Sequence, residues 1–128
     1  MILLDTTVVI DYTHAKDPVL QALFSSLTLG VCGIVRAEVL AGWRSAKDRA
    51  KLIAILDGLT QISTPDLIWD AVGDTLAELG RNGLTVPVPD AVIATLGMDL
   101  DIDIWSRDPH FPAMQQVLPR LKLFQEPP

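Results

Sequence analysis

Short apolar runs alternate with helical segments along the whole chain, and this alternation restricts the possible folds most strongly. Strands are predicted at residues 2–4, 29–32, 61–62 and 102–105, with a last edge strand at 121–124. Capping residues and helical spacing predict helices over residues 17–24, 34–43, 47–57, 64–81 and 90–98, with an extended link at 87–89. Strands that alternate with helices favour a parallel sheet covered on both faces. The sequence therefore predicts a three-layer α/β/α fold with a central, mostly parallel sheet of about four to five strands.

Length and composition predict one soluble domain. A chain of 128 residues is typical of a single domain, so we expect one domain over residues 1–128, with a loose tail at 126–128. Residues 18–35 carry no charge, but glycines, a proline and polar side chains interrupt them, so a membrane span is not expected. The single cysteine, Cys32, lies in an apolar run and is predicted to be a buried hydrophobe. One cysteine cannot form an internal disulfide, and a reducing cytoplasm is the expected location.

The charge balance argues against a protein that binds nucleic acid over most of its surface. The formal net charge is −6, which does not exclude a local nucleic-acid site. The basic cluster between Arg44 and Lys51 is interpreted as a solvated helix face, with an RNA-backbone rim as the alternative. Arg36 and Arg107 each flank a candidate acid and are expected to contact phosphate or to form ion pairs. The three tryptophans are predicted to be core or interface residues.

Four acids stand where acids are unusual. Asp5 and Asp108 follow predicted strands, and the carboxyl ends of parallel strands are where sites form. Glu38 lies among apolar residues of a predicted helix, and Asp90 begins another helix. Each acid alone fits an ordinary loop or first-turn position. Together they predict a pocket of converging carboxylates, which repel one another unless a cation lies among them, and Mg²⁺ prefers such oxygen ligands.

Four motifs in order carry a resemblance to a known family. Ile2-Leu3-Leu4-Asp5-Thr6-Thr7 is similar to the opening of PIN-domain proteins, and Glu38-Val39-Leu40-Ala41-Gly42 is similar to their second motif. Asp90-Ala91-Val92-Ile93-Ala94 resembles the third motif, and Ser106-Arg107-Asp108-Pro109-His110-Phe111 the fourth. In size and motif style the chain looks most like the VapC-type toxins of bacterial toxin–antitoxin pairs. Its departures from the family pattern, at Thr7, Thr95, Leu96 and Trp105, remove no acid and concern local packing.

The resemblance implies an endoribonuclease that hydrolyses RNA phosphodiester bonds with Mg²⁺, or with Mn²⁺ as a substitute. Asp5, Asp90 and Asp108 would be metal ligands, and Glu38 would be a ligand directly or through water. Thr7 and Ser106 would orient waters or carboxylates from behind. The partners that the resemblance implies are RNA, a small antitoxin protein and a second copy of the chain in a homodimer.

Two other functions remain open from the sequence. A phospho-acceptor signalling domain of the receiver type has a similar size and an acidic Mg²⁺ pocket, but it usually has paired acids after its first strand, and here Asp5 stands alone. A catalytically silent PIN fold that serves as a binding scaffold is disfavoured because all four acids are present. Asp99-x-Asp101-x-Asp103 resembles the start of an EF-hand, but it lacks the required glycine and final glutamate and is interpreted as a solvated turn.

Overall fold

A parallel sheet forms the centre of the molecule. The computed structural model describes residues 1–14 and 16–128, and within them the sheet has four strands. They are β1 (Ile2–Leu4), β2 (Leu29–Cys32), β3 (Thr60–Ile62) and β4 (Asp103–Trp105), arranged in the order β3-β2-β1-β4. All three pairings are parallel. Because β1 and β4 are neighbours, the segments that follow them leave the sheet side by side.

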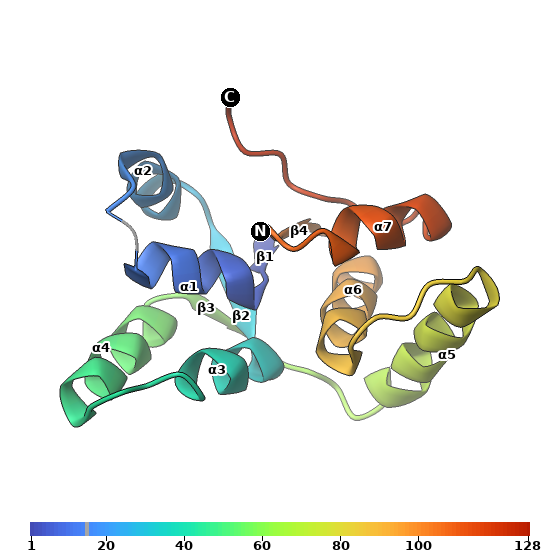
Figure 1. Ribbon diagram of the computed structural model, residues 1–128, viewed down its shortest axis with the longest axis horizontal. Coiled ribbons are helices and arrows are strands. Elements are labelled where there is room, and N and C mark those ends of the chain that lie inside the picture. Colours follow the sequence, from blue (N-terminus) through green and yellow to red (C-terminus); the bar gives the residue numbers. More distant parts are fainter. Residues whose placement is uncertain (15) are drawn as a thin grey trace.

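Helices cover both faces of the sheet, which confirms the predicted α/β architecture. They are α1 (Thr6–His14), α2 (Pro18–Ser26), α3 (Gly33–Leu40), α4 (Ala46–Asp57), α5 (Ile68–Arg81), α6 (Val88–Leu100) and α7 (His110–Val117). In Figure 1, α1, α2 and α4 lie on one side of the strands, and α5, α6 and α7 lie on the other. The capping residues predicted to begin α2 and α4 do so: the side chains of Asp17 and Ser45 accept hydrogen bonds from backbone N–H groups of the first turn.

Several element boundaries differ from the sequence prediction. Helices α1 and α7 were not predicted, and the helix expected over 34–43 ends at Leu40. The expected link at 87–89 instead begins α6, since proline is tolerated in a first helical turn, where its missing N–H has no partner. Residues 121–124 form a single parallel bridge to β4 rather than a strand. In the expected loose tail, Glu126 accepts hydrogen bonds from Trp105 and Arg107.

Helix α6 packs closely against β4 and lies beside α5. A Cβ atom on Gly97 would lie 2.6 Å from Cδ1 of Ile104, so glycine is needed for this approach. The hydroxyl of Thr95, which is buried, donates to the hydroxyl of Thr75 on α5 at 2.8 Å. Thr95 therefore fits its position through a polar contact between two helices. These contacts hold α6 against α5 and β4, and the first turn of α6 carries Asp90.

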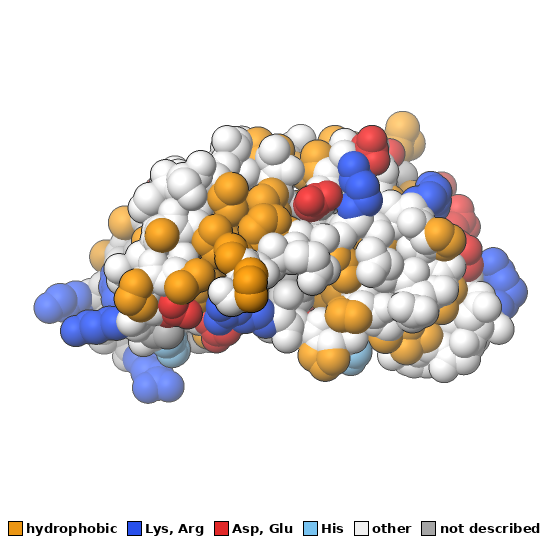
Figure 2. Space-filling view, turned by 90° about the horizontal axis from the view of Figure 1, so that it is seen from above, with side chains coloured by type: hydrophobic (Ala, Val, Ile, Leu, Met, Phe, Trp, Pro, Cys, Tyr) orange, Lys and Arg blue, Asp and Glu red, His pale blue; other side chains and the backbone are white. Residues whose placement is uncertain are grey.

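The tryptophans divide between the core and the surface. Trp105 is fully buried between Phe24 and Phe124, with ring centroids 5.7 and 4.9 Å away. Trp43 and Trp69 are half-exposed, at 50% and 51%. Figure 2 shows apolar side chains gathered on one face, between the part of the molecule with α2 and the part with α7. Among residues 1–14 and 16–128, no helix combines the length and the apolar character needed to cross a membrane.

Candidate metal centre

Asp5 lies at the carboxyl end of β1, where the neighbouring strand β4 also ends. Leu4 and Trp105 are paired in the parallel register, and the backbone N–H of Asp5 donates to the carbonyl of Trp105 at 2.9 Å. The Asp5 residue is only 3% exposed. Its Oδ2 accepts two hydrogen bonds, from Thr7 Oγ1 at 2.7 Å and from Ser106 Oγ at 2.6 Å. Two hydroxyl donors on one oxygen fix the orientation of this buried carboxylate.

The same two hydroxyls connect Asp5 to the loop that follows β4. Ser106 Oγ accepts a hydrogen bond from the backbone N–H of Asp108 at 2.9 Å. Thr7 Oγ1 accepts one from the backbone N–H of Arg107 at 3.0 Å. Thr7 and Ser106 thus position both Asp5 and the backbone of the loop that carries Asp108.

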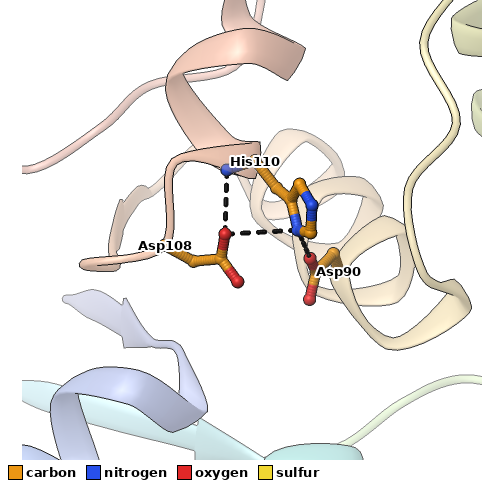
Figure 3. A group of neighbouring side chains, drawn as sticks. All are labelled: Asp90, Asp108 and His110. Carbon is orange, nitrogen blue, oxygen red and sulfur yellow. Dashed lines mark hydrogen bonds and ion pairs between the residues drawn. The ribbon is translucent and has the colours of Figure 1, made fainter.

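His110 brings Asp90 and Asp108 together (Figure 3). Its Nδ1 lies 2.8 Å from Asp90 Oδ2 and 3.2 Å from Asp108 Oδ1. The backbone N–H of His110 also donates to Asp108 Oδ1 at 2.9 Å, which turns the chain into α7. One ligand atom from each of the three residues lies within 4.8 Å of the others, so the group could hold a metal ion.

The electrostatics of this group reflect crowded negative charge. Burial raises the pKa of the Asp90 carboxyl, and the charges of Asp5 and Asp108 raise it further, although the hydrogen bond with His110 acts in the opposite direction. The same hydrogen bond, with the charges of both aspartates, raises the pKa of the His110 imidazole. A single imidazole faces this group of carboxylates, so the site favours additional positive charge.

Glu38 differs from its prediction. Its side chain was expected on an inward apolar face of its helix, but it is exposed on α3, and Thr6 Oγ1 donates to its Oε1 at 2.7 Å. Because Thr6 follows Asp5 directly, Glu38 is tied to the start of the same helix that Asp5 precedes. The described contacts connect Asp5 with Asp108 through Ser106 and Asp90 with Asp108 through His110, and they attach Glu38 only to this neighbouring turn.

Both arginines that flank candidate acids form ion pairs. Arg36 binds Asp57 at 2.7 Å. Arg107 binds Asp11 at 2.9 Å and both carboxylate oxygens of Glu126, at 2.7 and 2.9 Å. Of the two roles predicted for these arginines, phosphate contact or ion pairing, the structure therefore contains the ion pairs. The basic side chains between Arg44 and Lys51 are all exposed, as the interpretation as a solvated helix face expects.

Sequence reasoning missed His110 as part of this group. The histidine stands in the fourth motif, but no role in the site was assigned to it. The available signal was its place two residues after Asp108, where the turn into a helix returns the side chain toward the preceding acid. The contact with Asp90, 20 residues away in sequence, required the packing of α6.

The donor set fits a divalent cation. It combines carboxylate oxygens from separate elements with one imidazole nitrogen. Carboxylate oxygens are ligands of Mg²⁺ and Mn²⁺, and imidazole nitrogen is a ligand of Mn²⁺ and of the later transition metals. The His110 side chain is 41% exposed, so the group is open to solvent on that side. Asp90 and Asp5 are buried, so water offers little hydration to offset their charge.

Solved structures share this fold over nearly the whole chain. A chain of VapBC-1 from nontypeable Haemophilus influenzae matches with a TM-score of 0.81 and 17% identity, covering 98% of both chains. The chain therefore shares its fold with chains of VapBC complexes. DNA-bound VapBC from Salmonella typhimurium matches with a TM-score of 0.78, 19% identity and 96% of both chains covered. VapBC-5 from Mycobacterium tuberculosis, a member of the VapBC family of toxin–antitoxin systems, matches with a TM-score of 0.69 and 18% identity, and 96% of both chains is covered.

Comparison by sequence gives a different result. No protein-family model and no curated protein matches the chain. At identities below 20% these structures establish that the PIN-like fold is shared, and the site residues must be argued from their own geometry. In this PIN-like fold, the candidate centre lies where β1 and β4 end and α6 begins.

Proposed function

We propose that the chain is a metal-dependent endoribonuclease that hydrolyses RNA phosphodiester bonds. The observation that carries the proposal is the group formed by Asp90, Asp108 and His110, whose charge is coupled to buried Asp5 at the end of the central strand. Two carboxylates and an imidazole lie together there, and the charge of a third carboxylate, that of Asp5, acts on Asp90. The shared fold with VapBC proteins supports the same function but does not carry it.

Each residue has a role in this proposal. Asp5, Asp90 and Asp108 would hold Mg²⁺ or Mn²⁺, and Glu38 would act directly or through water. The bound metal would supply charge to the phosphoryl oxygen, lower the pKa of a water and stabilise the leaving oxygen. Ser106 and Thr7 hold the Asp5 carboxylate in place through hydrogen bonds to its Oδ2.

The test is cleavage of RNA by the purified chain. We expect cleavage with Mg²⁺ or Mn²⁺, loss of cleavage with excess chelator, and a loss of at least 100-fold in Asp5→Asn and Asp90→Asn. Asp99→Asn is the matched control, because Asp99 is an exposed acid on the same helix as Asp90 and lies at its other end. Full activity in chelator or in both site variants would reject the mechanism. A folded chain that cleaves no RNA under any condition would favour the silent binding scaffold.

The physiological role we infer is that of a toxin held inactive by a small antitoxin in the cytoplasm. A cavity of about 480 Å³ lies beside Glu38, between α1, α3 and α4, and its apolar lining includes Ile10, Val39 and Leu52. A hydrophobic antitoxin segment would fit this groove. A basic side chain from that segment could then reach the carboxylates and replace the charge of the metal without its chemistry.

Growth assays test the toxin role separately from the chemistry. Expression of the chain alone is expected to arrest growth, and co-expression with a neighbouring small reading frame is expected to relieve the arrest. Ile10→Asp in the groove should weaken relief while RNA cleavage in vitro persists. If the chain cleaves RNA but never arrests growth, the toxin role is rejected and the nuclease function stands.

We also propose that the chain forms a homodimer. Support comes from exposed apolar side chains, among them Trp43, Trp69 and Leu67, the last of which is 88% exposed. Such residues are more frequent at protein interfaces than on the surface of a monomer. Light scattering at tens of micromolar should give twice the 13.9 kDa of one chain. A monomer at that concentration would reject the dimer.

A further inference from the structure

The imidazole of His110 contacts two carboxylates through one ring nitrogen, which a simple ion pair does not require. Its Nδ1 faces one oxygen of Asp90 and one of Asp108 at the same time, at 2.8 and 3.2 Å. Ionised carboxylates only accept hydrogen bonds, so a single ring nitrogen and two acceptors are directed at one small volume. Figure 3 shows the imidazole edge between the two acids, which come from different elements.

The distances match those between neighbouring ligands of a divalent ion. Two ligand atoms at adjacent corners of an octahedron, each about 2.1 Å from the metal, lie about 3.0 Å apart. The separations of Nδ1 from the two carboxylate oxygens lie on either side of this value. One ligand atom from each of the three residues lies within 4.8 Å of the others, so one ion could contact all three after the side chains adjust.

We propose that His110 is a direct ligand, through Nδ1, of the metal that Asp90 and Asp108 bind. The proposal rests on the function proposed above and adds a nitrogen ligand to what the sequence predicts as an all-carboxylate site. Ring nitrogen Nε2 then carries the proton and faces solvent, as the partial exposure of the side chain permits. The two contacts of Nδ1 direct the ring toward both acids, and the backbone N–H of His110 binds Asp108 Oδ1 beside it.

A nitrogen ligand has a consequence for metal choice. Imidazole binds Mn²⁺ and the later transition ions better than it binds Mg²⁺, which prefers oxygen ligands and water. The chain should therefore bind Mn²⁺ more tightly than Mg²⁺. Replacement of His110 should weaken Mn²⁺ binding by about tenfold or more and should reduce the preference between the two ions.

Pulsed electron paramagnetic resonance of bound Mn²⁺ tests the ligand directly. The chain has two histidines, so in His14→Gln any histidine signal must come from His110. The protein is prepared without a polyhistidine tag and with ¹⁵N in its histidines only. We expect a coupling of Mn²⁺ to histidine ¹⁵N in the wild type and in His14→Gln. The coupling should be absent in His110→Gln, whose fold is checked by circular dichroism.

The outcomes separate this inference from the function on which it rests. If Mn²⁺ binding requires Asp90 but shows no coupling to histidine, His110 is not a ligand, and the proposed carboxylate nuclease stands. A chain that binds no Mn²⁺ at all would overturn both. If His110→Gln does not fold, the labelled His14→Gln chain still decides the question, because a coupling there supports the proposal and its absence rejects it.

Discussion

Ser106→Ala tests whether the loop after β4 positions the buried acid. Ser106 Oγ donates to Asp5 Oδ2 at 2.6 Å and accepts from the backbone N–H of Asp108 at 2.9 Å. Alanine removes both hydrogen bonds and leaves the rest of the loop unchanged. Asp5 then keeps one hydroxyl donor on that oxygen, from Thr7.

The magnitude follows from the two lost bonds. A hydrogen bond to a charged group contributes about 1.5–3 kcal/mol, and one between neutral groups about 1 kcal/mol. Ser106 is partly exposed, so water replaces some of the second bond. We therefore expect Ser106→Ala to lower the free energy of unfolding by about 2 kcal/mol. For a chain of this length that corresponds to a fall in Tm of roughly 6–10 °C.

Urea and thermal unfolding with excess chelator measure this cost. Ser25→Ala is the matched control, since Ser25 is exposed and its hydroxyl donates to a backbone carbonyl within its own helix. It should change stability by less than about 0.5 kcal/mol. Thr7→Ala and the double variant complete a double-mutant cycle. Because the two hydroxyls donate to the same oxygen, we expect their stability costs to depart from additivity by about 0.5 kcal/mol or more. A cost for Ser106→Ala no larger than that of the control would refute the positioning role.

Three further predictions follow from the charges around the site. Asp90→Asn should melt a few degrees above the wild type at pH 7 with chelator, because the raised pKa of Asp90 makes its ionised form costly above the ordinary carboxyl pKa; the difference should vanish near pH 3. His110→Gln should be less stable than the wild type below about pH 6.5, and this deficit should shrink as the pH rises through the raised native pKa, as melting curves from pH 5 to 9 would show. Glu126→Gln should cost about 1 kcal/mol or less at pH 7, since its pair with Arg107 is partly exposed, and the cost should disappear as the pH falls through the lowered native pKa of Glu126; equal costs at pH 3 and pH 7 would contradict the ion-pair account.

The fold was predictable where local signals agreed with the packing. Asp17 and Ser45 cap the helices that they were expected to begin, and the strand at 29–32 has the predicted bounds. Helix α1 was missed because its sequence is rich in β-branched residues, which favour strands. It is helical because Val8 and Val9 are fully buried in the core, and a local pattern does not record that packing.

The candidate site was predictable in its acids and not in its contacts. Asp5 and Asp108 could be placed because they follow strands, whose parallel order brings their ends together. The exposure of Glu38 could not be read from its apolar neighbours, because the side of α3 that faces the core depends on α1 and α4. His110 and Glu126 reach their partners across 20 and 19 residues, through a turn and a terminal segment that carry no periodic signal.

Metal titration followed by binding and cleavage in the same sample tests the central claim most directly. Mn²⁺ is added to chelator-treated wild type, Asp90→Asn and Asp99→Asn, and calorimetry and RNA cleavage are recorded together. The account predicts that binding and cleavage saturate at the same metal concentration in the wild type and in Asp99→Asn, and that both are lost in Asp90→Asn. Cleavage that proceeds without metal, or that persists in Asp90→Asn, would contradict it.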